Sequence, residues 1–448
     1  MAESLNRKVP AFPAQRGAVA ISAAFLLLAV GLSGVLPLWL DEILQLVETR
    51  STTPNQLIHL LPRHPGAAPL GYIFQKAVFL MAGYSVRLAR FPSALAASGA
   101  ILVTGCIGRD LGLKRTWLAP ALFALFPLTL RYACESRTYA PGLFFSTLAS
   151  WLFLRLVKNP GRPRAMLYCL SLTAAIYTQP YTIFVGVAQT LWALVDRDRK
   201  VAVWSAIAGA VAVIAFLPWY LWTKSAWQFN IEGAGVRFQF SPKTPLMLFR
   251  ELVGAGYWGS GLLVILFIVA MVHRGAGDRW VKLLVMLIGV PSVLAVAADG
   301  MFGYFVATRQ LMWVLPAVAI LAAAGMERRP RAGLAIGVLL AVICIWQDVR
   351  FFTGPKEDWQ AASDALSAEV RRGACLVIVP AEEIRSYAFF RPDLAQPHCP
   401  AARTVVAFTP YATNAQRAAA IYALNSRGYT KQSGTEAGRS QIDLYTSP

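Results

Sequence analysis

Carboxylates and arginines recur beside long apolar stretches of this 448-residue chain. Asp41 and Glu42 follow Trp39 at the end of the first apolar stretch, and Arg137 and Arg309 border two later ones. A carboxylate can take the proton from an attacking hydroxyl group. Guanidinium groups can hold a phosphate group that leaves. These residue types therefore indicate acid-base chemistry beside a bound phosphate.

Further polar residues share this position at the borders of apolar stretches. Charged residues at a membrane boundary are candidates for a buried polar site, unless they lie in the short basic connections between helices that face the cytoplasm. The predicted site residues are Asp41, Glu42, His64, Arg90, Glu135, Arg137, Tyr139, Gln179, Tyr181 and Arg309.

Each of these residues also has a simpler structural interpretation. Asp41 and Glu42 could mark the exit of a helix into water. Arg90 and Arg309 could anchor helix ends by extending toward the membrane surface. The remaining interpretations are a loop position for His64, an ion pair between Arg137 and Glu135, and helix termination with cavity lining for Gln179 and Tyr181.

Composition determines the class of protein to which this site belongs. Hydrophobic residues make up 56% of the chain and charged residues 15%, whereas soluble proteins are roughly one quarter charged. Ten charge-free runs reach fifteen residues or more, and a spanning helix needs about 20 mostly apolar residues. The sequence therefore predicts a polytopic α-helical membrane protein.

The number of spans follows from these runs. The run from 165 to 195 is too long for one crossing, and Gln179-Pro180 near its middle favours a turn. About eleven helices result, over 17–40, 91–108, 116–130, 138–154, 165–178, 181–195, 201–223, 252–273, 283–298, 310–326 and 332–347. Residues 69–83 are read instead as a juxtamembrane or re-entrant helix within an outer loop, 41–90.

The net charge of +19, from 42 Lys and Arg against 23 Asp and Glu, fits this topology. Alternate connections are short and basic, such as the one with Arg109, Lys114 and Arg115. The positive-inside rule places these in the cytoplasm, with the N-terminus. The predicted site and the C-terminal tail then lie outside. Nucleic acid is not an expected partner, because the basic excess is spread over separate connections.

The tail beyond residue 354 has the composition of a small α/β domain. Asp358 to Val370 and Asn414 to Leu424 have helical spacing, while Cys375 to Pro380, Arg403 to Thr409 and Gln441 to Thr446 have strand patterns. The predicted domains are therefore 1–354 and 355–448. Cys375 and Cys399 both fall in the outer domain, where disulfides persist, so a bridge between them is a hypothesis.

Other chemistry has little support. The chain contains no P-loop, no H-E-x-x-H, no C-x-x-C and no dinucleotide fingerprint after a strand. The natural substrate with an apolar body and a phosphate head at membrane depth is a polyprenyl-phosphate-linked sugar. Two other classes remain open: a lipid-linked glycan transporter or flippase, and a membrane anchor that displays the outer domain.

The order of motifs adds a resemblance to a known family. W-x-D-E, H-P…P-L-x-Y, R-L-x-R-F-P-S-A-L, E-S-R-T-Y, T-Q-P-Y and T-R-Q-x-x-x-x-L-P follow one another between residues 20 and 325. This order resembles the bacterial protein O-mannosyltransferase-like branch of the GT-C glycosyltransferases, to which the aminoarabinose lipid A transferases are related.

The resemblance implies an inverting transfer from a polyprenyl-phosphate sugar on the periplasmic side of a bacterial inner membrane. Asp41 matches the family's catalytic carboxylate and Glu42 its neighbour. Arg137 and Tyr139 match its R-x-Y motif, and Arg309 matches the arginine before its L-x-x-P span. His64 matches a loop histidine, although Gly66 to Ala68 interrupt the usual paired prolines. The acceptor would be a cell-envelope glycan, lipid or protein. No cofactor and no metal ligands are predicted, and a divalent metal has no support in the sequence.

Overall fold

The chain forms two compact units in the computed structural model. The helical unit comprises residues 1–33 and 54–351, and the C-terminal unit comprises residues 34–53 and 352–448. The sequence predicted a domain boundary near residue 354, which assigned residues 34–53 to the membrane domain. The structure groups this segment with the tail, because α2 (Leu40–Ser51) packs against α18 (Ile384–Ala388). The described residues are 16–63, 68–233, 243–274, 278–302, 307–395 and 402–447.

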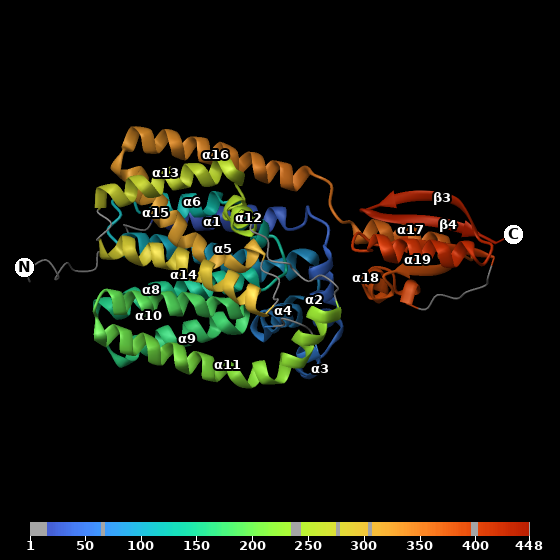
Figure 1. The fold of residues 1–448 in the computed structure, drawn as a ribbon, viewed down its shortest axis with the longest axis horizontal. Helices are drawn as coiled ribbons and strands as arrows, with labels where there is room; N and C mark the ends of the chain where they lie inside the picture. Colours follow the sequence, from blue (N-terminus) through green and yellow to red (C-terminus); the bar gives the residue numbers. More distant parts are fainter. Residues whose placement is uncertain are drawn as a thin grey trace, which may run out of the picture. The chain divides into compact units, whose positions relative to one another are not determined.

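The described part of the helical unit consists of helices joined by short connections (Figure 1). Its first half contains α1 (Arg16–Leu32), α3 (Pro54–Leu60), η3 (Leu61–Arg63), α4 (Pro69–Ala82), α5 (Val86–Asp110), α6 (Leu118–Leu125), α7 (Pro127–Ala133), α8 (Tyr139–Lys158) and α9 (Arg162–Thr178). Its second half contains η4 (Pro180–Thr182), α10 (Ile183–Val195), α11 (Arg199–Gly233), α12 (Thr244–Glu251), α13 (Gly256–Arg274), α14 (Arg279–Phe302), η5 (Thr308–Val314), α15 (Leu315–Arg328) and α16 (Pro330–Thr353).

Proline and glycine account for the breaks between several of these helices. The predicted turn at Gln179-Pro180 is confirmed, because α9 ends at Thr178 and Gln179 is extended. Phe126, before Pro127, is also extended and separates α6 from α7. Between α12 and α13 the chain bends by 81°, and Gly254 there has a φ of +79°.

Six described helices are long and apolar enough to cross a membrane, or seven if the bent pair α12 and α13 counts as one span. Helices or 3₁₀ turns occupy all eleven predicted segments, but several are short or broken. The chain is therefore a multi-pass membrane protein, while the count of eleven spans and the orientation stay predictions. Pro69–Ala82 is helical, as expected for the loop segment.

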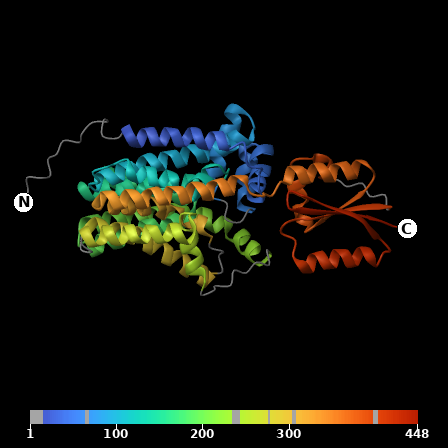
Figure 2. The same ribbon diagram turned by 90° about the horizontal axis from the view of Figure 1, so that it is seen from above.

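Helix α5 joins the helices that carry the predicted site. It packs against α1, α4, α7 and α8, and Figures 1 and 2 show it beside α8 within the bundle. The turn between α7 and α8 carries Glu135, Arg137 and Tyr139. The packing of α5 therefore brings the ends of these helices into one region.

The C-terminal unit is an α/β domain with a four-stranded sheet. Strand order is β1-β2-β4-β3, with β1 parallel to β2 and the other pairs antiparallel. Figure 2 shows α17 and α19 on opposite faces of the sheet. Val406, Phe408 and Tyr445 form part of its core. The elements are α2, α17 (Trp359–Arg371), β1 (Cys375–Val379), η6 (Ala381–Glu383), α18, η7 (Pro392–Ala395), β2 (Arg403–Phe408), α19 (Asn414–Asn425), β3 (Thr430–Ala437) and β4 (Ser440–Thr446).

The predicted helices and strands of the tail are confirmed, and Cys375 is disulfide-bonded. Cys399 lies outside the described residues, so its pairing with Cys375 stays a prediction. Strand β3 was not predicted. Its residues are polar and mostly exposed, which gives no alternation of apolar and polar residues.

Candidate functional site

The centre of the predicted site in the helical unit is the turn that ends with Tyr139. Tyr139 is buried at the first position of α8. The hydroxyl group of Ser93 on α5 donates a hydrogen bond to the Arg137 carbonyl oxygen at 3.1 Å. On α4, a Cβ atom built at Gly71 would lie 2.3 Å from the Thr138 methyl carbon. The turn is therefore held closely between α4 and α5.

Two arginines converge on the Tyr139 side chain from distant parts of the chain. The Arg309 Nε group donates a hydrogen bond to the Tyr139 hydroxyl oxygen at 2.9 Å. The central guanidinium carbon atoms lie 5.7 Å from the centre of the Tyr139 ring for Arg309 and 5.9 Å for Arg137. The structure thus brings together three of the predicted residues, and we name Arg137, Tyr139 and Arg309 the arginine-tyrosine cluster.

This cluster has the chemistry of an anion-binding site. Two guanidinium groups near one aromatic ring place positive charge and N–H donors together, and such groups bind phosphate by charge-assisted hydrogen bonds. Cation–π contacts with the ring hold the guanidinium groups in place. Both arginine side chains are half-buried, so the cluster is neither fully exposed nor sealed.

Tyr132 also belongs to this neighbourhood, although the sequence did not identify it as a site residue. Its ring lies 5.2 Å from the Tyr139 ring in an edge-to-face contact, and its side chain forms a hydrogen bond with Arg309. The charge of Glu135 also acts on Tyr132. The sequence signal that could have identified Tyr132 is its position seven residues before Tyr139, on the preceding helix.

Arg131 is a second residue that sequence reasoning missed. Its guanidinium carbon lies 4.3 Å from the Phe351 ring centre, and Nη2 donates a hydrogen bond to the Gln347 carbonyl oxygen at 3.4 Å. The charges of Asp348, Glu135 and Glu251 all act on Arg131. Arg131 therefore joins α7 to α16 and balances the carboxylate groups around the cluster.

Gln179 and Tyr181 form the turn between α9 and α10, as predicted. The Tyr181 ring stacks on the ring of Trp313 at 6.5 Å, four residues after Arg309. A Cβ atom built at Gly142 on α8 would lie 2.9 Å from the Gln179 Cβ atom. The turn thus packs against both the helix that begins with Tyr139 and the segment that carries Arg309.

An apolar cavity of about 700 Å³ lies between α12, α14 and η5. Leu248, Val296 and Leu311 contribute to its lining. Leu311 is two residues from Arg309 on the same 3₁₀ segment. The cavity can therefore hold an apolar chain, and the segment that carries Arg309 contributes one residue to its lining.

Arg90 is inside the protein rather than at its surface. Its side chain is 1% exposed, and Nη1 donates a hydrogen bond to the Ser33 carbonyl oxygen at 2.6 Å. Ser33 follows the last residue of α1. The described contact shows Arg90 fixing the end of α1, and its role in binding a substrate stays a prediction.

Asp41 and Glu42 lie in the first turn of α2, within the C-terminal unit. Carboxylates are favourable at this end of a helix, because the helix dipole is positive there. Glu42 is fully buried, whereas Asp41 is partly exposed. Within the same unit, the charge of Asp41 acts on Glu383 and Tyr411. His64, the remaining predicted residue, lies outside the described residues.

Across the described part of the chain, no group of three or more His, Cys, Asp or Glu side chains could hold a metal ion. The arginine-tyrosine cluster itself supplies only cationic and aromatic groups.

Comparison with known proteins gives a match of one segment to a family model and a likeness of the whole fold. Residues 63–222 match the family model described as dolichyl-phosphate-mannose-protein mannosyltransferase. The chain also superimposes on ArnT from Cupriavidus metallidurans in the apo state, with a TM-score of 0.60 and 14% identity over 95% of this chain and 97% of that one. The chain has the GT-C fold.

A second ArnT structure from the same organism, bound to undecaprenyl phosphate, matches this chain with a TM-score of 0.58, 13% identity and the same coverage of both chains. No curated protein sequence matches it. The resemblance predicted from motif order is supported by the family model over residues 63–222 and by the fold shared with ArnT. The matched segment 63–222 includes Arg137 and Tyr139 but not Asp41 or Arg309.

Proposed function

We propose that the chain is an inverting glycosyltransferase that moves a sugar from a polyprenyl-phosphate donor to a hydroxyl group of a cell-envelope acceptor. The observation that carries this proposal is the convergence of Arg137 and Arg309 on Tyr139. Two guanidinium groups suit an anionic head, and an apolar cavity that is partly lined by the same 3₁₀ segment as Arg309 suits a hydrocarbon body. The family model and the ArnT complex, which holds undecaprenyl phosphate, support the same donor class.

The reaction is a single displacement. Asp41 takes the proton of the acceptor hydroxyl group as its oxygen attacks the anomeric carbon. The new carbon–oxygen bond forms while the bond from that carbon to the donor phosphate breaks, and the bonding electrons leave with polyprenyl phosphate. Because the attack comes from the opposite face, the configuration at the anomeric carbon inverts.

The arginine-tyrosine cluster compensates the charge that develops on the leaving phosphate. Arg137 and Arg309 supply the positive charge, and Tyr139 orients Arg309 through the hydrogen bond to Nε. In this proposal Glu42 and Glu135 shape the local charge, His64 helps to orient the substrate, and Gln179 and Tyr181 support the cavity. Arg90 maintains the end of α1 before the segment with Asp41.

The apolar cavity is the proposed site of the isoprenoid chain. Its described lining is almost entirely apolar, so burying hydrocarbon there costs no unpaired polar group. The proposed location is a bacterial inner membrane with the site facing the periplasm, in agreement with the distribution of basic residues. The acceptor can be a glycan, a lipid or a protein.

The test uses purified full-length protein with a polyprenyl-phosphate sugar and a cell-envelope fraction as acceptor. Asp41→Asn should keep the fold and the binding of donor but abolish transfer, and Asp41→Glu should retain part of it. Wild-type transfer by Asp41→Asn would remove the assigned base. Movement of the donor across vesicles without any transfer would favour the transporter hypothesis instead.

A deletion strain provides an independent measurement of the substrate class. Loss of the enzyme should cause a polyprenyl-phosphate sugar to accumulate and one surface glycan to disappear. The identity of that lipid would name the sugar, and the altered envelope component would name the acceptor.

A further inference from the structure

Helix α2 is separated in sequence from the tail but belongs with it in space. Residues 34–53 and 352–448 form one compact unit, and within it α2 packs against α18. Asp41 is at the first turn of α2, and Arg50 is in its last turn. The C-terminal unit therefore contains the carboxylate to which the proposed function assigns the acceptor proton.

One specific contact joins α2 to the residue that follows α18. The Arg50 guanidinium carbon lies 5.4 Å from the centre of the Phe389 ring. This is a cation–π distance. Phe389 is itself fixed, because its backbone N–H donates to the Arg385 carbonyl oxygen at 3.0 Å.

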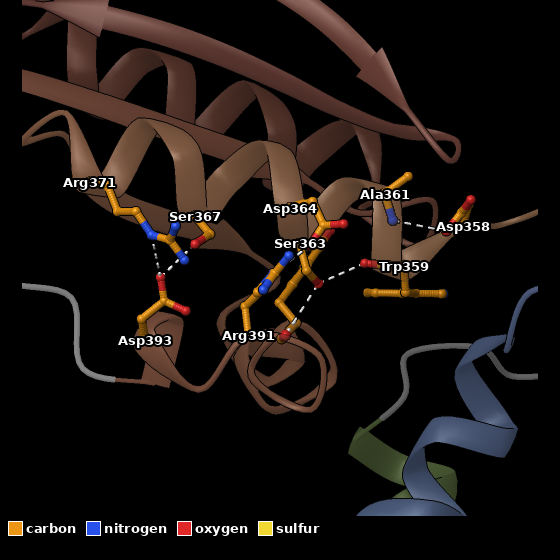
Figure 3. Close-up of polar contacts among 10 residues, drawn as sticks. Asp358, Trp359, Ala361, Ser363, Asp364, Ser367, Arg371, Arg391 and Asp393 are labelled. Atoms are coloured by element: carbon orange, nitrogen blue, oxygen red, sulfur yellow. Dashed lines mark hydrogen bonds and ion pairs between the residues drawn. The ribbon is translucent and has the colours of Figure 1, made fainter. Parts of the chain in front are cut away.

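Helix α18 is in turn firmly attached to the α/β core. Ser363 on α17 donates hydrogen bonds to the carbonyl oxygens of Trp359 and Tyr387, and the contacts of α17 are drawn in Figure 3. The Tyr387 hydroxyl group lies 3.0 Å from the Ser440 hydroxyl oxygen on β4. Beyond α18, Arg391 forms an ion pair with Asp364 (Figure 3). A rigid connection thus runs from the sheet through α18 to α2.

Asp41 interacts electrostatically with two titratable groups of the same unit. The charges of Asp41 and Glu357 act on Tyr411, whose hydroxyl group donates to Glu357 at 2.7 Å. Asp41 also acts on Glu383, which accepts a hydrogen bond from Ser386 at 2.9 Å. Asp41 therefore shares its electrostatic environment with the α/β domain as well as with its own helix.

We propose that the C-terminal domain is the positioning element for Asp41, and that the contact between Arg50 and Phe389 sets the orientation of α2. Both are positioning residues, because they act through the helix rather than on the substrate. Nine residues separate Asp41 from Arg50, a distance of about 13 Å along a helix. A rotation at the Arg50 end therefore displaces the carboxylate at the other end, and small displacements at a reacting centre are costly.

The experiment is a double-mutant cycle in the full-length enzyme. Arg50→Ala and Phe389→Ala should each lower kcat by about two- to fivefold, which is the energy range of a partly exposed cation–π contact. The KM for the donor should not change, because the phosphate cluster belongs to the helical unit. Arg50→Lys and Phe389→Trp, which keep a cation and a ring, should restore most of kcat.

The double variant should be no slower than the slower single variant, because both substitutions remove the same contact. Tyr422→Ala is the matched control, since Tyr422 is a 76% exposed aromatic residue on α19 of the same domain. Hydrogen exchange of residues 40–51 should increase in Phe389→Ala but not in the control.

This inference rests on the proposed role of Asp41 as the base. Different results would contradict the role of Asp41 and the positioning role of the C-terminal domain. Transfer by Asp41→Asn at the wild-type rate would remove the proposed base, while the exchange measurement would still report on α2. If Asp41→Asn is inactive, three results would each overturn the positioning role. These are an unchanged kcat in both alanine variants, losses that multiply in the double variant, and an equal loss in Tyr422→Ala.

Discussion

Arg309 and Tyr139 are 170 residues apart in sequence and are joined by a 2.9 Å hydrogen bond from Nε to the phenol oxygen. The bond connects the start of α8 to η5, and the Tyr132 side chain also forms a hydrogen bond with Arg309, so two phenol groups orient this guanidinium group. A ligand with several oxygen atoms, such as a phosphate, matches this arrangement.

Tyr139→Phe should test that bond without removing the ring. Hydrogen bonds to charged groups contribute about 1.5–3 kcal/mol, so we expect the KM for the donor to rise about tenfold or more. Steady-state kinetics with varied donor would measure it. Tyr177→Phe is the matched control, because its hydroxyl group donates to the Ala215 carbonyl oxygen elsewhere in the helical unit. A KM equal to that of the wild type would contradict the orienting role of Tyr139.

Gly71→Ala should disturb the arginine-tyrosine cluster through the contact of α4 with the turn that carries Thr138. The new Cβ atom would meet the Thr138 methyl carbon, between Arg137 and Tyr139, and a displacement of about 1 Å at a reacting site can cost about 10²-fold in rate. We expect kcat to fall at least about tenfold. Thr138→Ser removes the methyl group, so the double variant should recover much of the activity.

Gly31→Ala is the control for that pair. Gly31 lies in α1, and a Cβ atom built there meets nothing within 4 Å. Its activity should equal that of the wild type. If Thr138→Ser failed to restore Gly71→Ala, the close approach of α4 to the turn would not be the cause of the loss.

Some of these relationships could be read from the sequence and others could not. Runs free of charge predicted where helices lie, and Gln179-Pro180 predicted a turn, because both signals are local. The motif order also predicted Arg137, Tyr139 and Arg309 as one group, and the structure places them together. Their catalytic roles stay predictions.

The other features depend on packing between distant segments and could not be predicted from the sequence. Nothing in residues 40–51 indicates a partner more than 300 positions later, and an amphipathic helix after a membrane span is read with its sequence neighbours. Strand β3 was not predicted, because it is a polar edge strand. Gly438-Arg439 before Ser440 is nevertheless a two-residue hairpin signal. Tyr132 and Arg131 become site residues only through helix packing.

Glu383 should make the stability of the C-terminal unit depend on pH. Burial raises the pKa of its carboxyl group above the usual 4.5. The folded state thus holds this proton more tightly than the unfolded chain, so the contribution of Glu383 to stability is greatest below pH 4.5 and falls as the pH rises through the raised pKa. Glu383→Gln cannot ionise and should remove this decline.

Hydrogen exchange of β1 in the full-length protein, corrected for the intrinsic pH dependence of exchange, would measure the effect. Glu436→Gln, at an exposed position on β3 of the same domain, is the control and should keep the wild-type profile. An identical pH profile for Glu383→Gln and the wild type would exclude Glu383 as the source.

Lys431 should stabilise the sheet by neutralising Asp443. Asp443 is 1% exposed, and its Oδ2 atom lies 2.8 Å from Lys431 Nζ. Lys431→Met leaves this carboxylate without its cation and should cost about 1–3 kcal/mol, less than a fully buried pair because Lys431 is half-exposed. Exchange of the β3 and β4 amides would report the loss.

Lys431→Met combined with Asp443→Leu replaces the pair with apolar groups and should recover most of the stability. A single Lys431→Met variant as stable as the wild type would show that Gln441, which donates to Asp443 at 3.0 Å, suffices as the partner.

The split origin of the C-terminal unit also has a consequence for biosynthesis. Residues 34–53 leave the ribosome about 300 residues before the segment from 352 onward that completes their unit. At 5–20 residues per second, α2 waits roughly 15–60 seconds for its partner. Under the proposed positioning role, a nascent chain that stalls or is truncated in this interval carries the proposed base but not the domain that orients it, so we expect activity only after the segment from 352 onward has been translated.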